Sequence, residues 1–338
     1  MKPKLCISFF IVFMLMSCFV LAYDDTGGHW AESAIDIWSD RGLVNGKGNN
    51  SFDPDGNMTR AEAAAILSRL LKLEESADIS QFADVKKGDW YYDVISTCVA
   101  AGILGGDNGK MNPNGFLTRE MFCTMLVRAL GIIPEGKLNK SFSDISLVSD
   151  WSKESMNALV NRGYVNGVGD NTLAPKANIT RASVVTLIDR ITANYGSNVL
   201  SGMTDTISLV FTNASVKKGF SGTVTVVSNG VTLSLKGAGN VSIVIMADNV
   251  RVTDIPNGTF VTVSKKADET ILNNKKVKSN SIFYVTKKEV VYMTTAENTL
   301  KEEYKKPKLD VVEFDDEDVI NTSTDDDDDQ LEWDEFLY

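Results

Sequence analysis

The hydrophobic and polar positions of this chain follow two different periods. Up to about residue 196, apolar residues recur at intervals of three and four in short blocks, as Ala63, Ile66 and Leu70 do. This spacing is typical of helices that bury one face. From about residue 205 to 291, Val, Ile, Thr and Ser form short alternating runs between Gly and Asn residues, which is typical of strands and turns. The pattern therefore predicts a helical part followed by a β-rich part.

Three copies of one unit make up the helical part. Trp30, Trp90 and Trp151 recur at spacings of 60 and 61 residues, and the same anchors follow each of them in the same order. These anchors are a Gly-apolar-apolar-x-Gly run, an apolar-x-Pro, and a Thr-Arg pair that begins five residues after the proline. They comprise Gly42, Gly102 and Gly163; Pro54, Pro113 and Pro175; Thr59-Arg60, Thr118-Arg119 and Thr180-Arg181; and, at the start of each unit, Asp25, Asp84 and Asp144 of an aromatic-x-Asp.

Each unit is predicted to fold as helix, long loop, helix. The first helix follows the Trp, and the glycine after it stands in the position of a C-terminal cap. The Gly, Asn, Asp and Pro residues that come next predict a loop. Thr59 then begins the second helix, with Glu62 completing a capping box, whereas Thr118 and Thr180 cap without that glutamate. Since a pair of short helices cannot bury its apolar face alone, we expect the three units to pack together.

Two cysteines fall inside this repeat frame. Cys98 aligns with Trp38 and Leu159, and Cys123 aligns with Ala64 and Val185. Because these are core positions, we expect both thiols to be small buried hydrophobic groups. A disulfide between the two helices of the second repeat is the geometric alternative.

The residues after each N-cap suggest a site for a carboxylate. An arginine at this position lies near backbone N–H groups and the positive end of the helix dipole, and its guanidinium can bind a carboxylate through two parallel hydrogen bonds. A Trp ring can stack on the apolar face of a sugar, and a loop glycine lets the backbone approach a ligand. The candidate ligand-binding residues are Arg60, Arg119 and Arg181; Trp30, Trp90 and Trp151; and Gly46, Gly105, Gly106 and Gly167.

With these motifs in this order, the three units resemble the S-layer homology (SLH) domain over about half of the chain, from Tyr23 to Tyr195. The resemblance implies a helical assembly with pseudo-three-fold symmetry, attached non-covalently to a secondary cell-wall polymer that often bears pyruvylated N-acetylmannosamine. In the family, grooves between neighbouring units combine the Thr-Arg arginine, a loop glycine and the anchor Trp, which points to the candidates above. Repeats two and three depart from the Thr-Arg-Ala-Glu motif, with Glu120-Met121 and Ala182-Ser183 after the arginine.

A purely structural role is the alternative for each candidate. Each Trp can belong to the core, and each arginine can form a salt bridge with the opening aspartate of a unit, such as Asp25. The single histidine, His29, is expected to be a rim or packing residue rather than a ligand. With one histidine in the chain, His-based catalysis and a His-rich metal site are disfavoured, and we expect no catalytic set, metal ion or cofactor.

The β-rich part repeats with a period of 17 to 21 residues. Each period holds two strand-like runs separated by a corner such as Ser228-Asn229-Gly230 or Ala247-Asp248-Asn249. This arrangement favours a short parallel β-solenoid, with an antiparallel sandwich as the alternative. The fold class is therefore multidomain α + β, with a pseudo-three-fold helical bundle and a small all-β module.

Charge and hydropathy divide the ends from the body. The net charge is −11, but the segment from Leu309 to Tyr338 holds fourteen acidic residues and no Lys or Arg, so the body is nearly neutral and a nucleic-acid partner is disfavoured.

An apolar run ending at Ala22 predicts a secretory signal peptide, with an uncleaved anchor or lipidation at Cys18 as alternatives. The expected domains are a signal peptide (1–22), three repeats (23–78, 79–138 and 139–198), a β-rich module (203–292) and a disordered acidic tail (298–338).

Together with the signal peptide, the SLH resemblance implies a secreted protein of the cell wall or S-layer surface in a Gram-positive envelope. Its partners are expected to be an anionic secondary cell-wall polysaccharide and other surface-layer proteins, with no membrane span after signal cleavage. The alternative is a wall-glycan hydrolase tethered by the repeats, with its chemistry in the β-rich region.

Overall fold

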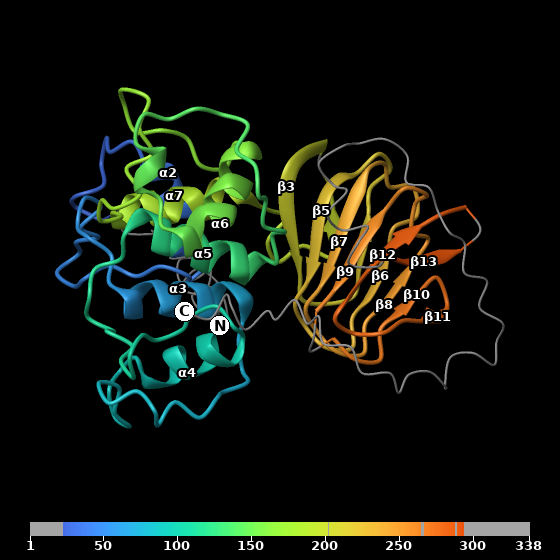
Figure 1. Ribbon diagram of the computed structural model, residues 1–338, viewed down its shortest axis with the longest axis horizontal. Coiled ribbons are helices and arrows are strands. Elements are labelled where there is room, and N and C mark those ends of the chain that lie inside the picture. The colour runs from blue at the N-terminus through green and yellow to red at the C-terminus, as the bar shows by residue number, and fades with distance from the viewer. Residues whose placement is uncertain (1–22, 202, 265–266, 288, 294–338) are drawn as a thin grey trace, which may run out of the picture.

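The computed structural model describes residues 23–201, 203–264, 267–287 and 289–293, which form a helical body and a β-solenoid side by side (Figure 1). The predicted signal peptide and acidic tail lie outside these residues. The helical body contains α2 (Glu32–Asp40), α3 (Arg60–Leu71), α4 (Tyr92–Ala100), α5 (Arg119–Leu130), the 3-10 helix η1 (Ile145–Leu147), α6 (Asp150–Asn161) and α7 (Arg181–Ile191).

Local capping defines the second helix of each repeat, as the sequence predicts. Thr59 accepts a hydrogen bond from the backbone N–H of Glu62 and the glutamate returns one, so the capping box is complete. Thr118 and Thr180 accept the corresponding backbone bond without a reciprocal glutamate. At the end of each first helix the glycine has positive φ, with 69° at Gly42, so the C-terminal caps are also confirmed.

The three repeats close around a pseudo-three-fold axis made of backbone hydrogen bonds. The residue before each N-cap threonine is Met58, Leu117 or Ile179. Met58 N–H donates to the Ile179 carbonyl, Leu117 N–H to Met58 and Ile179 N–H to Leu117, at 2.9–3.0 Å. Each repeat therefore donates to one neighbour and accepts from the other, and all three side chains are buried.

One apolar core fills the helical body. Trp38 is buried, and its indole N–H donates to Asp189 Oδ1 at 2.9 Å on α7. Cys98 and Cys123 are buried and free, so the expectation of small buried thiols holds and the disulfide alternative does not. Burial raises the pKa of both thiols to about 12.

The β-rich part is a parallel β-solenoid with two sheets. One sheet has the order β1-β3-β5-β7-β9-β12-β13, and the other has the order β11-β10-β8-β6-β4-β2. The strands are β1 (Thr192–Ala193), β2 (Val199–Leu200), β3 (Met203–Val210), β4 (Ala214–Val216), β5 (Ser221–Val226), β6 (Thr232–Ser234), β7 (Val241–Ile245), β8 (Arg251–Thr253), β9 (Phe260–Val263), β10 (Ile271–Leu272), β11 (Lys275–Lys276), β12 (Ser281–Val285) and β13 (Val290–Met293).

Successive turns of the solenoid stack in register. Val224 pairs with Ile243, and Ile243 with Val261, so these turns are 19 and 18 residues long, within the predicted period. All three side chains point into the solenoid core. The last strands reverse direction, because β12 pairs antiparallel with both β9 and β13. The solenoid is thus the favoured alternative, and the sandwich is excluded.

The solenoid is continuous with the helical body. Strand β1 starts at Thr192, directly after α7 and inside the range predicted for the third repeat, and it pairs parallel with β3. Ile207 of β3 belongs to the core of the helical body. The Thr225 hydroxyl donates to the Leu130 carbonyl at the end of α5 at 3.2 Å. These contacts attach the two parts through packed side chains and through the chain itself.

Candidate functional site

Each Thr-Arg arginine reaches from its own repeat into the loop of the next repeat. The guanidinium nitrogen Nη2 donates in each case to a loop carbonyl of that neighbour, and together the three contacts form a closed cycle. The pairs are Arg60 with Gly105 at 2.8 Å, Arg119 with Asn166 at 2.8 Å, and Arg181 with Asn45 at 2.7 Å. We refer to these places as the 1–2 junction, the 2–3 junction and the 3–1 junction.

The backbone amides at the starts of α3, α5 and α7 are already bonded. Arg60 N–H donates to the Gly115 carbonyl and the next amide, Ala61 N–H, to the Pro113 carbonyl; the other two junctions repeat this pair. The threonine hydroxyl accepts from the third residue of each helix. The first-turn amides therefore serve the junctions and are not available to a ligand.

The arginines differ in how completely the protein itself uses them. Arg181 is 4% exposed; its Nε donates to the Phe52 carbonyl at 2.8 Å and its guanidinium lies 4.5 Å from the Phe52 ring centre. Its Nη1 is 3.6 Å from Glu62 Oε1. Burial lowers the pKa of Arg181, which Glu62 opposes. This arginine is thus buried and paired.

Arg60 and Arg119 are half-buried and have fewer partners. Arg60 Nε donates to the Met111 carbonyl at 2.8 Å, as Arg181 Nε does to Phe52. Arg119 lacks that bond: its Nε is buried without a hydrogen-bond partner. Of the three guanidinium groups, Arg119 retains the most donor capacity, because a buried N–H without an acceptor favours any acceptor that can reach it.

The three anchor tryptophans are exposed. Trp30, Trp90 and Trp151 are 64%, 61% and 38% exposed, so the core-packing alternative is wrong for all three. Trp38, eight residues after Trp30 and inside the first helix, takes the core position instead. An exposed Trp repeated in three units offers ring faces to an external partner.

A residue one or two positions from each tryptophan contacts the loop that the neighbouring arginine holds. His29 Nε2 is 3.4 Å from Asp55 Oδ1 in the first repeat. The Tyr91 hydroxyl bonds the Asn114 side chain in the second. In the third, Lys176 Nζ donates to the Ser149 hydroxyl. The position after the loop proline therefore lies near the start of the first helix in every repeat.

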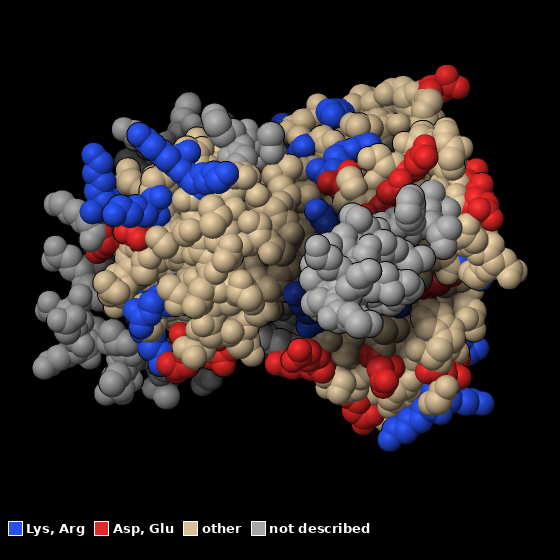
Figure 2. Space-filling model, turned by 180° about the vertical axis from the view of Figure 1, so that it is seen from behind, with Lys and Arg blue, Asp and Glu red and all other residues tan. Residues whose placement is uncertain are grey.

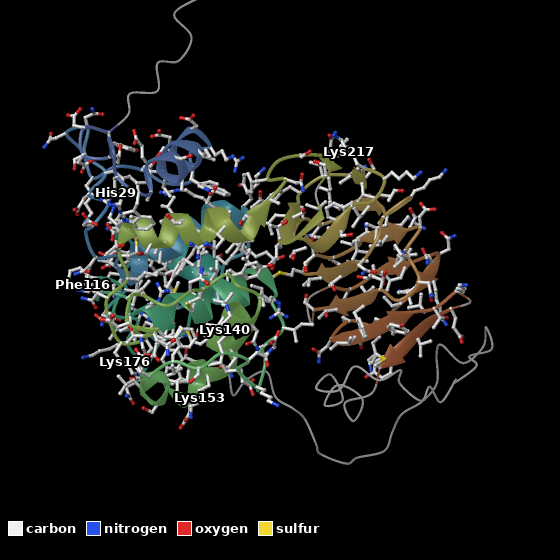
Figure 3. All side chains as sticks on the ribbon, turned by 90° about the horizontal axis from the view of Figure 1, so that it is seen from above. His29, Phe116, Lys140, Lys153, Lys176 and Lys217 are labelled. Carbon is white, nitrogen blue, oxygen red and sulfur yellow. The ribbon has the colours of Figure 1, made fainter. Side chains whose placement is uncertain are left out.

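The junctions open on the end of the helical body that faces away from the solenoid. Figure 3 places His29, Phe116 and Lys176 together on this end, although they come from three different repeats. Phe116 is 55% exposed and stands one residue before Leu117 of the axis. The solenoid lies on the opposite side of the helical body in this view.

Packing within each repeat explains why the loop positions are glycines. A Cβ added to Gly46 would lie 2.5 Å from Tyr23 Cε1, and one on Gly106 would lie 2.3 Å from Phe82 Cε1. At Gly167 the Phe142 ring is 3.1 Å away. The aromatic residue that opens each unit therefore packs on the glycine of its own loop, and Gly105 contributes its carbonyl to Arg60.

The opening aspartates hold loops and not arginines, so the salt-bridge alternative is wrong. Asp25 accepts hydrogen bonds from the backbone N–H groups of Phe52 and Asp53 and from the Ser51 hydroxyl. Burial acts to raise the pKa of Asp25, but these hydrogen bonds outweigh it and lower the pKa to about 2. Asp84 and Asp144 accept the corresponding pairs of loop amides.

The middle residue of each apolar-x-Pro has a positive φ, in the left-handed region. The third repeat has an alanine at this position, where the other two have Asp or Asn. Asp53 has a φ of 59° and Asn112 one of 51°, which Asx residues tolerate, but Ala174 has 50°. A Cβ on Gly56 would lie 2.1 Å from Asp53 Oδ2. The third repeat carries Ala177 at that glycine position, which is compatible with the short Ala174 side chain.

We therefore expect Ala174 and Ala177 to be coupled. Ala174→Asn alone will lower the free energy of unfolding, because the amide meets the Ala177 Cβ. Ala177→Gly alone will cost about 0.5–1 kcal/mol through backbone entropy. Combined, the two changes will be less destabilising than their sum by about 1 kcal/mol or more, measured by urea unfolding. Additive costs would contradict this coupling.

Two charged residues at the 2–3 junction escaped the sequence interpretation of the site. Glu120 is 2% exposed, at the position of Ala61 and Ala182, and accepts a hydrogen bond from Lys176 Nζ. Lys176 stands where the other repeats have Asp55 and Asn114. Alignment of the three repeats could have revealed both residues. Glu120 stands where the other repeats have alanine, and Lys176 is the only positive charge at its position.

No group of three or more His, Cys, Asp and Glu residues within the described part of the chain could hold a metal ion. The helices of that part include none that is long and apolar enough to cross a membrane.

Fold and junctions together define a class: a repeat protein in which three copies of one helix-loop-helix unit close around an axis and form three corresponding junctions. A family model described as S-layer homology domain matches residues 22–64, 81–121 and 141–185. The chain carries three S-layer homology domains and is an SLH-containing protein of the bacterial cell surface, associated with the cell wall.

Curated relatives share the repeats. The chain is 32% identical over 200 residues to the "Surface-layer 125 kDa protein" of Lysinibacillus sphaericus, and 31% identical over 177 residues to the "S-layer protein sap" of Bacillus anthracis. It is 34% identical over 172 residues to the "Exoglucanase XynX" of Acetivibrio thermocellus. These matches cover 58%, 52% and 50% of this chain but 17%, 21% and 16% of the relatives. The chain therefore spans only a minor part of their length.

Proposed function

We propose that the helical body binds an anionic secondary cell-wall polysaccharide at the junctions between its repeats and so anchors the protein non-covalently to the wall. The observation that carries this proposal is the threefold recurrence of an exposed Trp beside a loop that the preceding repeat's arginine holds. A structural Trp would be buried, as Trp38 is. The S-layer proteins among the relatives support the same assignment.

The chemistry of the junctions suits a sugar that carries a carboxylate. A Trp ring stacks on the apolar face of a pyranose, and its indole N–H is free to meet a hydroxyl. A guanidinium supplies a permanent positive charge and planar donors that match a carboxylate. Pyruvylated N-acetylmannosamine has both a pyranose ring and a carboxylate, so we propose it as the ligand unit. It would bind through Arg60 and Arg119, while the buried Arg181 stabilises the 3–1 junction.

Co-sedimentation with purified cell wall tests the anchor. We expect the full chain to pellet with wall that retains its secondary polysaccharide and to stay in the supernatant after that polymer is extracted. Equal binding to both wall preparations would contradict the proposal, because the peptidoglycan alone would then suffice.

We further propose that the protein is a wall-anchored surface component and not itself a hydrolase. The relatives with hydrolase names match this chain over the repeats alone, so their catalytic parts have no counterpart in the match. The acidic side chains of the solenoid, such as Asp248 and Asp254, bond backbone and hydroxyl groups at its corners. Release of reducing sugar from wall glycans by the purified chain, lost on replacing solenoid carboxylates, would contradict this.

A further inference from the structure

The helical body as a whole does not attract anions. Residues 23–191 contain 17 Lys and Arg but 22 Asp and Glu, whereas residues 192–293 contain 11 and 6. On the face seen in Figure 2, blue side chains gather on the solenoid and red ones are more frequent over the helical body. An acidic ligand at the repeats therefore depends on local charge, and the three junctions differ in this respect.

Negative charge surrounds the arginine of the 3–1 junction. Arg181 is buried against Phe52 and paired with Glu62, and the exposed carboxylate of Asp55 stands next to His29 at the rim. A ligand carboxylate would meet the negative charges of Asp55 and Glu62, while Arg181 is only 4% exposed. This junction disfavours an anion.

The 1–2 junction is close to neutral. Arg60 has two backbone acceptors, Met111 and Gly105, and the residue after the loop proline is the uncharged Asn114. Asp89, beside Trp90, adds a negative charge and accepts from the Lys86 amide. A neutral sugar hydroxyl suits this arrangement as well as a carboxylate does.

The 2–3 junction has a lysine at its rim, and Asp150 beside Trp151 is paired with Lys153. Lys176 Nζ donates both to Glu120 Oε1 and to the Ser149 hydroxyl, which precedes α6 and Trp151. The Lys176 side chain is half exposed while Glu120 is buried, so the ammonium faces outward and the carboxylate inward. The same Glu120 carboxylate accepts hydrogen bonds from the Ser149 N–H and hydroxyl, which partly neutralise its negative charge. Glu120 thus positions Lys176 and is screened from the rim by it.

Arg119, at the same junction, makes fewer hydrogen bonds within the protein than Arg60 and Arg181 do. Its Nη2 donates to Asn166 and its buried Nε has no partner in the described structure. Figure 3 places Lys176 on the end of the body that carries Phe116 and His29, where the junctions open. Trp151 is the least exposed of the three anchors, at 38%, so its ring has neighbours on one side.

We propose that the 2–3 junction is the principal carboxylate-binding site of this protein and that Lys176, held in place by Glu120 and Ser149, is the residue that gives it preference for an acidic over a neutral sugar. The inference rests on the proposed function, since it states that the three junctions contribute unequally to polysaccharide binding. The ammonium and the Arg119 guanidinium would share the carboxylate, and the Trp151 ring would carry the sugar.

The test titrates the full chain, labelled at the tryptophan indole nitrogens, with two probes. These are the methyl glycoside of 4,6-pyruvylated N-acetylmannosamine and that of unmodified N-acetylmannosamine. We expect the Trp151 indole signal to move at lower concentrations of the pyruvylated probe than the Trp30 and Trp90 signals. The neutral probe should not distinguish the three.

Lys176→Asn, which introduces the residue of the second repeat, should weaken binding of the pyruvylated probe at Trp151 about tenfold and leave the neutral probe unchanged. Lys140→Asn, at an exposed lysine, is the matched control and should change neither. If loss of Lys176 destabilises the fold by leaving Glu120 buried without its partner, the double variant Glu120→Ala/Lys176→Asn reproduces the Ala61 and Asn114 pair, and the same loss is expected.

Failure of this inference differs from failure of the proposed function. If Trp90 or Trp30 responds first, or if Lys176→Asn leaves the preference for the acidic probe intact, the 2–3 junction is not the principal site, while polymer-dependent wall binding still supports the anchor. If no indole signal moves and the chain ignores the wall polymer, the proposed function itself is wrong.

Discussion

Replacing Trp30, Trp90 and Trp151 together with alanine is expected to weaken binding to polymer-bearing cell wall by at least about 100-fold, with the fold intact. Each ring is worth about 1 kcal/mol as a stacking surface. Because the junctions belong to one rigid body that meets one polymer, the losses combine as they do in multivalent binding. Stability should change little, since all three rings are exposed. Wall co-sedimentation at graded protein concentrations measures the binding, and thermal unfolding measures the stability.

Tyr292→Ala is the matched control for this experiment. Tyr292 is a 46% exposed aromatic residue on the last strand of the solenoid, distant in sequence from the repeats. It should leave wall binding unchanged. Undiminished binding by the triple tryptophan variant would show that the exposed rings are not the ligand platform, and equal loss in both variants would point to a nonspecific aromatic effect.

Arg181→Ala is expected to lower the free energy of unfolding by about 3 kcal/mol. The change removes a buried, paired guanidinium. It leaves the Phe52 and Asn45 carbonyls without their donor and the Glu62 carboxylate without its positive partner. These groups belong to the first repeat, so the 3–1 junction should loosen and with it the ring of three repeats. Urea unfolding followed by far-ultraviolet circular dichroism measures the effect.

Arg119→Ala provides the comparison within the same protein. It removes one hydrogen bond to Asn166 and an Nε without a partner, so its cost in stability should stay below about 1 kcal/mol. Its effect on wall binding should exceed its effect on stability, which is the reverse of Arg181→Ala. Similar destabilisation by both substitutions would mean that the arginines are structurally equivalent despite their different burial.

This contrast changes how the arginines should be tested. A variant without Arg60, Arg119 and Arg181 would lose binding through unfolding as readily as through a lost ligand contact. The tryptophans separate the two causes, because they are exposed where Arg181 is buried.

Many features of the fold could be predicted because they are local. A threonine three residues before a glutamate caps a helix through atoms that are already close in the chain, and Thr59 with Glu62 does so. A glycine that ends a helix needs only its own φ, as Gly42 shows. The solenoid period of β-branched runs and Asn-rich corners is likewise local and repeats every turn, and the registers of β5, β7 and β9 agree with it.

The predictions that were wrong concern contacts between distant segments. The structural alternative placed Trp30 in the core, but packing between the repeats buries Trp38 and leaves Trp30 exposed. The aspartate that opens each unit, such as Asp25, was considered as a salt-bridge partner of an arginine. Its carboxylate instead accepts hydrogen bonds from loop N–H groups of its own unit. Opposite charge alone did not identify the partner, since a backbone N–H competes equally for a carboxylate.

By itself, the sequence determined three helix-loop-helix units, their caps and turns, the solenoid that follows, and the arginine, tryptophan and glycine positions of the candidate site. Only the tertiary structure decided that each arginine serves the next repeat's loop, that Arg181 is buried while Arg119 keeps a free donor, and that Glu120 holds Lys176 at the rim. The physical reason is that helix caps and turns depend on atoms a few residues apart. Burial, by contrast, depends on which repeat packs against which, and the three junctions bring together residues between 45 and 136 positions apart.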